Sequence, residues 1–543
     1  MREEVEPPAL RAHDADDADD ADDAGAAPAL RCGSILFPGA DDVPARWQEA
    51  REPPDCFHDL NLGRVVEAIT AGRQEYDLAP IFHAPLGSLD AVAYRQEAMR
   101  DMEHRALRQA VAAFAERMRA MRRLLAAAKE SAYELARQRW HLAAVEVYTE
   151  AVERLAHDLG GAGLAARGLR GFRDALADRA RSAAFRTLKD EARSLAAALQ
   201  AIRYCMLIRD GSITVCRYRG ESDHGAAVAE TFRKFQQGAV KDYLYKFEDR
   251  PSMNHVEAEV LERVALLEPD AFAALARFYG QHADFVDPAI VRFDREIQFY
   301  AAYLDYVDRF RGAGLPFCYP QVSDRHRQVG ARDTFDLALA DKLVRENGTV
   351  VCNDFTLRGP ERIFVVTGPN QGGKTTFART FGQLHHLASL GCPVPGLEAR
   401  LFLYDRLLTH FEREEDIVNL RGKLEDDLVR IHRILDQATP NSILILNEIF
   451  SSTTLADALL LGREVLRRIV RLDALCVCVT FLEELAARSE ETTVSMVSAV
   501  DPCDPALRTF KIERRAADGL AHALSIAEKH RVTYRWLRER LRT

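Results

Sequence analysis

The sequence predicts a multidomain protein in which a long α-helical region, interrupted by one small β-hairpin, precedes an α/β domain. With 543 residues, the chain is too long for a single core, and its length alone suggests roughly three to four domains. Ala91 to Tyr148 is rich in Ala, Leu, Arg, Glu and Met with almost no Gly or Pro, which predicts long helices that can act as levers or coiled-coil arms. Beyond about residue 320, strand-like and helical segments alternate, which is typical of a largely parallel, buried sheet.

The composition is that of a soluble globular protein. Hydrophobic residues make up 48% and charged residues 29% of the chain, and no apolar run reaches the 18 residues that a membrane span needs. A membrane protein and a secretory signal are therefore not expected, and the cytoplasm is the expected compartment. The ten cysteines are scattered, and the closest pair, Cys476 and Cys478, lies in an apolar β-like run. This favours reduced core thiols over a zinc site.

The charge of the chain is concentrated at its start. The formal net charge is −10, but residues 1–24 carry ten acidic residues against two arginines, so the remainder is nearly neutral. Asp14 to Pro28 has almost no large apolar side chains, and we predict that residues 1–30 form a disordered acidic tail. A solubilising tail is favoured over a DNA mimic. Bulk charge neither supports nor excludes nucleic-acid binding, which depends on where Lys and Arg cluster.

Two further regions follow the tail. We predict a helical core and lever domain over residues 43–319 and a P-loop domain over 320–543, with Gly312, Gly314, Pro316 and Pro320 near the boundary. Within the helical domain, two alternating runs from Tyr204 to Tyr218 flank Asp210-Gly211, the dipeptide favoured in type I′ hairpin turns. Basic residues near this hairpin can contact a phosphate backbone, and a solvated hairpin face has at least equal weight: Arg209, Arg217, Arg219, Arg233 and Lys234.

One motif carries the chemistry. An apolar strand, Ile363 to Thr367, runs directly into a segment that matches G-x-x-x-x-G-K-[ST] at every fixed position. Backbone amides of such a loop wrap a phosphate, and the following helix turns its positive end toward the same charge. We therefore predict that ATP is bound by Gly368, Pro369, Asn370, Gln371, Gly372, Gly373, Lys374, Thr375 and Thr376. Lys374 is expected to reach the β- and γ-phosphates, and Thr375 to ligate Mg²⁺.

A second strand, Ser442 to Leu446, ends in Asn447-Glu448, where a Walker B element belongs. We predict that Glu448 acts as the general base and that Asn447 helps to hold Mg²⁺, directly or through water. An Asp is usual at the position of Asn447. The amide oxygen still accepts a hydrogen bond but brings no charge, so metal affinity or turnover is expected to be weakened. A purely structural cap at the strand end is the lesser alternative for Glu448.

These residues resemble the ATPase domain of the MutS DNA mismatch-repair family. The resemblance covers about residues 320–535 and is weaker over Leu60 to Met99. Its segments are TGPNQGGKTTFART (Thr367 to Thr380), LASLGCPVPG (Leu387 to Gly396), DRHRQV (Asp324 to Val329), NGTVVCNDFTL (Asn347 to Leu357), ILDQATPNSILILNEIFSSTT (Ile434 to Thr454) and ADGLAHALSIAEKHRV (Ala517 to Val532). It implies an ABC-type ATPase domain, a hairpin in a DNA-clamping arm and a homodimer with two composite ATP sites. A partner loop near Asn419 to Asp427 would complete each site.

Several positions depart from the family pattern. The chain starts at the lever domain, which leaves no room for an N-terminal mismatch-reading domain, and it has no Phe-x-Glu motif in a suitable context. Gly422 or Lys423 stands where the family has a signature Ser, and Thr480-Phe481 stands where it usually has a switch His. Together with Asn447, these changes touch three elements that govern hydrolysis. We therefore expect slow ATP hydrolysis and predict ATP binding more firmly than turnover.

The main functional hypothesis is an ATP-dependent DNA-binding protein of the MutS type, with a role in DNA mismatch repair or recombination. Nucleotide binding would close a dimer around duplex or branched DNA. The alternative is a nucleotide-gated scaffold or switch that binds a protein partner without DNA. An ABC-type ATPase of the SMC class is less favoured because that class places its ATPase halves at opposite ends of a much longer coil.

Two polar clusters could be read as metal sites, but a structural or surface role is favoured for each. His385 and His386 are adjacent and do not share a helix face, so a partly exposed structural role is expected. The charged residues between Arg413 and Asp427 are expected to form a solvated or subunit-facing surface.

Overall fold

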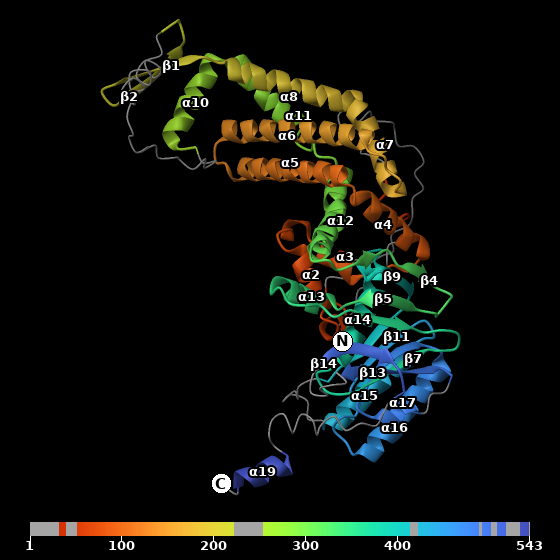
Figure 1. Cartoon of the computed structure of the whole chain (residues 1–543). Coiled ribbons are helices and arrows are strands. Elements are labelled where there is room, and N and C mark those ends of the chain that lie inside the picture. The colour runs from red at the N-terminus through yellow and green to blue at the C-terminus, as the bar shows by residue number, and fades with distance from the viewer. Residues whose placement is uncertain are drawn as a thin grey trace, which may run out of the picture. The chain divides into compact units, whose positions relative to one another are not determined.

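The computed structural model describes residues 32–39, 52–221, 253–412, 422–487, 491–500, 508–516 and 533–541 (Figure 1). These residues form a multidomain α/β protein with mixed sheets, which confirms the coarse fold class. The acidic tail, Arg233, Lys234 and residues 413–421 lie outside the described part. The described residues divide between two compact units, the first with Met121–Thr149 and Arg181–Phe285 and the second with Arg31–Ala120, Glu150–Ala180 and Val286–Thr543.

The first unit is built from helices. They are the distal part of α5 (Arg105–Glu130), the first part of α6 (Glu134–Gly161), α8 (Ala183–Ala201), α10 (His255–Leu267) and α11 (Pro269–Gln281). A capping box starts α10, because Asn254 and Glu257 each bond the other's backbone amide. Aromatic edges fill the core, where His141 lies 4.9 Å from Tyr279 and 5.2 Å from Phe285 between ring centroids. The long helices predicted before Tyr148 are therefore present.

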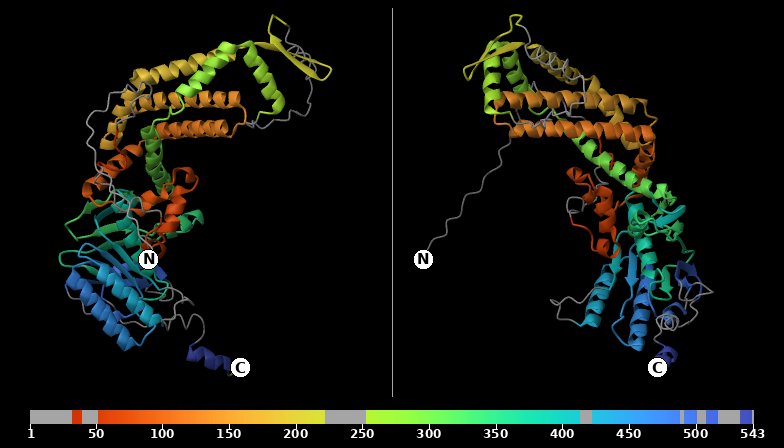
Figure 2. Two further views of the ribbon diagram at one scale, coloured as in Figure 1. Left: turned by 180° about the vertical axis from the view of Figure 1, so that it is seen from behind. Right: turned by 60° about the vertical axis from the view of Figure 1, so that its left-hand side comes forward.

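The predicted hairpin is also present in this unit. Strands β1 (Tyr204–Arg209) and β2 (Ser212–Arg217) pair antiparallel, and Asp210 and Gly211 have φ of 48° and 76°, as a type I′ turn requires. Both views of Figure 2 show this yellow hairpin projecting from the helices of its unit. The Arg217 guanidinium donates to the Leu267 carbonyl at 2.6 Å, which attaches the hairpin to the end of α10.

The second unit begins with short helices and a docked peptide segment. The helices that precede its sheets are α1 (Cys56–Asp59), α2 (Leu62–Thr70), η2 (Gln74–Tyr76), α3 (Ala79–His83), α4 (Leu89–Met102), α7 (Arg167–Arg181) and α12 (Pro288–Gly312). Phe172 of α7 stacks on Phe293 of α12 with ring centroids 3.6 Å apart. Residues 32–39 lie against α12, where the Glu296 carboxylate accepts from the Ser34 hydroxyl and the Ile35 amide, each at 2.8 Å.

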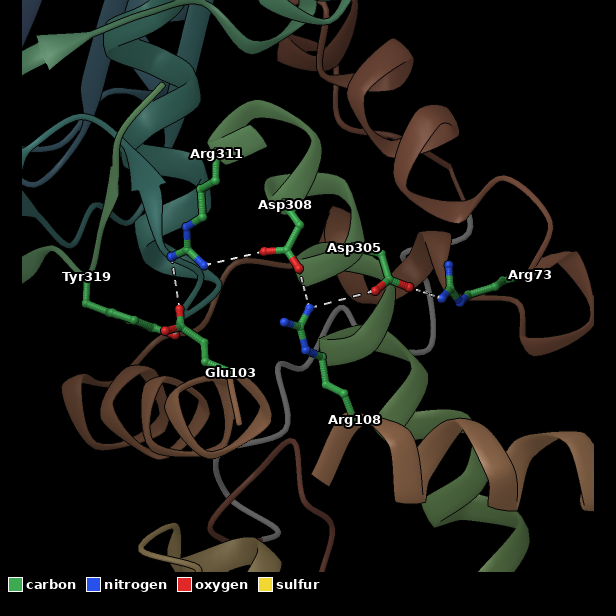
Figure 3. A network of polar contacts seen from close by, with 7 residues as sticks. All are labelled: Arg73, Glu103, Arg108, Asp305, Asp308, Arg311 and Tyr319. Atoms are coloured by element: carbon green, nitrogen blue, oxygen red, sulfur yellow. Dashed lines mark hydrogen bonds and ion pairs between the residues drawn. The ribbon is translucent and has the colours of Figure 1, made fainter. Parts of the chain in front are cut away.

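A polar network ties α12 to the elements around it (Figure 3). Asp305 and Asp308 of α12 pair with Arg108 of α5, and Asp305 also pairs with Arg73. At the end of the helix, the Arg311 guanidinium and the Tyr319 hydroxyl both donate to Glu103, at 3.0 and 2.9 Å. Exposed ion pairs are individually weak, but several shared charges in one network hold an orientation better than isolated pairs.

A six-stranded sheet forms the centre of the second unit. Its order is β10 (Leu407–His410), β11 (Ile443–Asn447), β12 (Leu475–Val479), β7 (Ile363–Thr367), β13 (Thr493–Val500) and β14 (Arg508–Arg514). All neighbours are parallel except β13 and β14. Every residue of β7, β11 and β12 is buried. The prediction of a largely parallel, buried sheet is therefore confirmed.

Helices cover both faces of this sheet, as the pleat of its apolar strands requires. Leu444 and Leu446 face α15 (Lys423–Gln437) and α16 (Leu455–Leu472) in one cluster, and the two blue-toned helices lie side by side in Figures 1 and 2. Phe364 points to the other face, where its ring meets Phe377 and Phe381 of α14 (Lys374–Ser389). Helix α17 (Glu483–Ala487) follows β12.

Smaller sheets flank the central one. Four strands lie in the order β4 (Gln321–Ser323), β9 (Glu398–Phe402), β5 (Gly330–Thr334) and β6 (Asn353–Thr356), and β3 (Phe317–Cys318) pairs with β8 (Val394–Pro395). Helices α13 (Leu337–Arg345) and α19 (Tyr534–Leu541) complete the described elements. A hollow of about 970 Å³ lies over β5, β6, β9 and β14, and its lining includes neither Lys374 nor Glu448.

The cysteines of the described residues are free thiols, and Cys476 and Cys478 are buried in β12. The predicted location of these two cysteines in the core is therefore confirmed. Among the described residues, no group of three or more His, Cys, Asp or Glu side chains could hold a metal ion. No helix in the described ranges is both long and apolar enough to span a bilayer.

Candidate nucleotide site

Three loops meet at the carboxyl ends of adjacent parallel strands. Gly368 to Gly373 follow β7, Asn447 ends β11 with Glu448 directly after it, and Thr480 and Phe481 follow β12. In open α/β sheets, ligands bind in the crevice at this edge. The fold therefore brings together residues that are separated by more than 70 positions in sequence.

The loop after β7 has a backbone that favours glycine. Gly368 and Gly373 have φ of 116° and 92°, and Gln371 has φ of 59°, all in the left-handed region. At Gly372, an added Cβ would lie 2.2 Å from the Ser498 hydroxyl oxygen. That hydroxyl donates to the Gly372 carbonyl at 2.7 Å. Ser498 therefore supports the loop from β13, a role that we did not predict; its only sequence signal is a polar residue in an apolar strand.

Lys374 is 4% exposed and its ammonium is held within its own loop. Its Nζ donates to the carbonyls of Gly368 and Pro369 at 2.9 and 3.1 Å, and to Asn370 Oδ1 at 3.5 Å. The Phe481 ring centroid lies 5.0 Å from Nζ, within the range of a cation–π contact. Desolvation lowers the pKa of Lys374, the Glu448 charge opposes this change, and Arg508 adds to it.

Thr375 joins the first turn of α14 to the end of β11. Its hydroxyl donates to Asn447 Oδ1 at 2.9 Å, and Asn447 is 7% exposed. Thr376 follows on the same turn and is half-buried, whereas Asn370 and Gln371 are exposed on the loop. The two residues predicted to hold Mg²⁺ are therefore in direct contact, although they lie 72 positions apart.

Glu448 lies at the tip of β11 in a left-handed conformation, with φ of 57°. Its amide donates to the Val479 carbonyl at 2.8 Å, which fixes the turn against β12. Desolvation raises the pKa of Glu448, the Lys374 charge lowers it, and Glu412 raises it; the net direction is upward. A carboxyl with a raised pKa at a strand end suits proton transfer, since a base works best when its pKa approaches the working pH.

Two exposed aromatic residues border the loop. Phe481 is 45% exposed, and its position is set by Thr480, whose amide donates to the Val366 carbonyl at 3.1 Å. Phe510 of β14 is 48% exposed and has φ of 58°, and its backbone lies next to Gly373. Asn353 clamps this turn, because its side chain donates to the Phe510 carbonyl and accepts from the Ile512 amide. We predicted neither Asn353 nor Phe510 as a site residue.

The predicted signature loop, which a partner subunit would supply, stays a prediction. Asn419, Leu420 and Arg421 lie outside the described part, Gly422 is the N-cap of α15, and Lys423 pairs with Glu412. The expectation of a solvated surface is wrong for Asp427, which is 6% exposed and lies 3.3 Å from His410 Nε2. A carboxylate on the inner face of an amphipathic helix is buried with that face when a partner is present.

The histidine pair is structural but not partly exposed as predicted. His385 and His386 are 0% and 2% exposed. His386 bridges Tyr404 and the Phe82 carbonyl at 3.0 and 2.8 Å, and the Nδ1 of His385 lies 2.8 Å from the Phe381 carbonyl. Burial lowers the pKa of each to about 4. Helix α14 is buried on all sides at this point, so helix-face spacing alone gave the wrong exposure.

The three loops lie in a segment that is similar to known proteins. Residues 364–529 match the model of MutS domain V. Similar curated proteins include "DNA mismatch repair protein MutS" of Halalkalibacterium halodurans, 27% identical over 230 residues that make up 40% of this chain and 25% of that protein. The proteins of the same name from Petrotoga mobilis and Rickettsia rickettsii are 28% and 29% identical, over 32% of this chain and 22% and 21% of their own lengths. The matched part thus spans about a quarter or less of these relatives. Over residues 364–529, the chain is similar to domain V of the MutS family.

Proposed function

We propose that the chain is an ATP-dependent DNA-binding protein of the MutS type, with a P-loop ATPase site at the carboxyl edge of the six-stranded sheet. The observation that carries this proposal is the contact between the Thr375 hydroxyl and Asn447 Oδ1 at 2.9 Å. It brings the first turn of the helix after the glycine loop to the tip of the neighbouring β11, where a metal beside a bound triphosphate would be held.

In this proposal, the loop from Gly368 to Gly373 presents its amides to the phosphates, and Lys374 neutralises their charge. Three oxygens of the same loop accept from Nζ, so the buried ammonium is held where the loop would present it to a phosphate. Thr375 and Asn447 hold Mg²⁺, directly or through water. Since Asn447 contributes no charge, the metal relies more on the phosphate oxygens than it would beside an aspartate.

Hydrolysis needs a group that orients and deprotonates water. Glu448 takes this role in our proposal, and its raised pKa, caused mainly by desolvation, makes it a stronger base than an exposed glutamate. Phe481 stands beside Lys374 without a hydrogen-bonding group of its own. We therefore propose that the protein binds ATP readily and turns it over slowly.

The DNA-binding part of the proposal rests on the family and on the hairpin. Arg209 and Arg219 are exposed at β1 and just beyond β2, where guanidinium groups can reach phosphates. The matched relatives are named DNA mismatch repair proteins. We propose that residues 43–319 form a helical lever domain with a clamp-like hairpin and residues 320–543 the ATPase domain. Nucleotide binding would close a cytoplasmic homodimer around duplex or branched DNA, in mismatch repair or recombination.

The test measures ATP binding and steady-state hydrolysis by the full chain, with and without duplex and branched DNA. Lys374→Ala should weaken ATP binding by about 100-fold, because a charge-assisted contact to phosphate is lost. Lys342→Ala, an exposed lysine of α13, is the matched control. Binding that survives Lys374→Ala would refute the site, and a nucleotide response that no DNA changes would refute the DNA-dependent part.

One observation favours the alternative of a nucleotide-gated scaffold without DNA. The hairpin exposes large apolar side chains on one face, with Tyr204, Met206 and Ile208 at 42%, 50% and 71%. Such a face suits a protein partner better than a phosphate backbone. Partners retained after nuclease treatment, together with no DNA binding at low salt, would support this alternative, because phosphate contacts are strongest at low salt.

A further inference from the structure

Two cysteines lie directly opposite each other on the exposed hairpin. Cys205 of β1 and Cys216 of β2 are partners in the antiparallel register, and both are free and half-buried. The Cys216 thiol points back across the ladder, since its sulfur lies 3.9 Å from the Cys205 carbonyl oxygen. Opposite residues of an antiparallel pair project to the same face, so the two thiols are neighbours.

The spacing of such a pair suits a disulfide. Directly opposite residues have Cα atoms about 4.5 or 5.5 Å apart, depending on their place in the ladder, and both values fall within the range that a disulfide bridges. The remaining adjustment is small because a two-stranded ribbon twists more freely than a wide sheet. The sheet contains only β1 and β2, so little packing opposes the adjustment.

We propose that Cys205 and Cys216 form a reversible disulfide when the protein meets a low-molecular-weight disulfide such as oxidised glutathione. In the first step one cysteine thiolate attacks the small disulfide, forms a mixed disulfide and releases one thiol. The second cysteine then attacks the protein sulfur of that mixed disulfide and displaces the other thiol. The protein loses two electrons and two protons, and the small disulfide gains both. Excess reduced thiol reverses the reaction.

Glu221 sets the order of the two steps. The Cys205 thiol donates to the Glu221 carboxylate at 3.3 Å; desolvation and this carboxylate raise the pKa of Cys205. Since the thiolate is the nucleophile, Cys216 attacks first and Cys205 resolves. Removing the carboxylate charge with Glu221→Gln should therefore accelerate closure of the disulfide several-fold.

The disulfide would stabilise the strand pairing of the hairpin more than a comparable disulfide would stabilise a strand pair in the core. An isolated two-stranded hairpin is only marginally stable in water, and Leu207 and Ile213, at 47% and 42% exposure, gain little from burial. A cross-link that closes the loop around Asp210-Gly211 removes open conformations from the ensemble. Amide exchange in β1 and β2 should slow by about tenfold or more. Cytosolic disulfides are usually transient and redox-sensing, which fits a half-buried pair on an exposed hairpin.

The experiment equilibrates the full chain in glutathione buffers of increasing oxidised fraction, with a chelator to exclude metal binding by the thiols. Peptide mass spectrometry then measures the linked Cys205 and Cys216 peptides. We expect the link to form in the wild type and in Cys352→Ser, a control that removes another half-buried thiol. Cys205→Ser should instead accumulate a mixed disulfide on Cys216.

The proposal is overturned if both thiols remain separately alkylatable at equilibrium in oxidised glutathione, or if each links to other cysteines instead. A link that forms without slowing exchange in β1 and β2 would overturn the stabilising effect. None of these readouts involves ATP or DNA. The inference therefore goes beyond the proposed function, and it stands or fails independently of it.

Discussion

The candidate nucleotide site and the hairpin contain short strands of similar apolar character, but their surroundings differ. Every residue of β7, β11 and β12 is buried, whereas Ile208 of the hairpin is 71% exposed. At the site, neighbouring strands and helices fix each polar group, such as Thr375 against Asn447. Within the described residues, the hairpin is held by the pairing of its own two strands and by the end of α10.

Because of this difference, a substitution measures a different property in each region. A substitution at the candidate site changes a side chain whose position is fixed by its neighbours, so its effect reports the role of that side chain in binding or hydrolysis. A change on the hairpin removes a side chain with few internal contacts, so its effect measures contact with a partner. We therefore expect substitutions at the candidate site to have the largest effects and those on the hairpin the smallest.

The largest effect is expected for Glu448→Gln. The amide keeps the size of the side chain but cannot accept a proton from water, so kcat for ATP should fall by about 100-fold or more while ATP binding stays within a few-fold. Single-turnover hydrolysis and equilibrium nucleotide binding separate the two quantities. Equal losses in both would show that Glu448 holds nucleotide instead of acting on water.

The raised pKa of Glu448 also predicts a pH dependence. A general base must be deprotonated, so the rate is full above its pKa and falls as the pH drops through it. Because this pKa is above the ordinary glutamate value, the loss should begin at a higher pH than for an exposed glutamate. A kcat profile that stays flat down to the ordinary glutamate range would contradict this role.

Asn447→Asp should have a smaller effect than Glu448→Gln, and it should strengthen a function of the site instead of weakening one. A carboxylate can ligate Mg²⁺ with a charge that the amide lacks, and we expect Mg²⁺ affinity in the presence of ATP to rise about tenfold. Without metal, the same buried carboxylate faces desolvation, so removal of Mg²⁺ should lower the melting temperature of the variant more than that of the wild type. Equal metal dependence in both proteins would place the metal elsewhere.

Phe481→His should raise kcat by a few-fold. The ring at this position lies 5.0 Å from the Lys374 ammonium, and an imidazole there can hydrogen-bond to a phosphate or to water, which phenylalanine cannot. Phe481→Leu is the matched control, because it keeps the apolar volume without a hydrogen-bonding group. If both variants behave alike in steady-state hydrolysis, position 481 does not limit turnover.

The same contrast explains what the sequence could predict. The glycine loop, Lys374 and Asn447 follow from local patterns, since each strand and the residues after it are contiguous, and the hairpin follows from Asp210-Gly211. Ser498 and Asn353 could not be found this way, because their contacts with Gly372 and Phe510 span 126 and 157 positions. The burial of His386 was missed for the same reason: it depends on Tyr404 and Phe82, which approach only in the folded unit.

The smallest effect is expected for Arg209→Ala on the hairpin, and it tests whether the exposed region contacts DNA. Loss of one phosphate contact should weaken DNA binding by a few-fold and reduce the slope of log affinity against log salt by about one. Arg193→Ala, an exposed arginine of α8 in the same unit, should leave the slope unchanged. An unchanged slope in Arg209→Ala with DNA binding intact would remove this arginine from the interface. In that case, the exposed apolar face of the hairpin would be the better candidate for its binding surface.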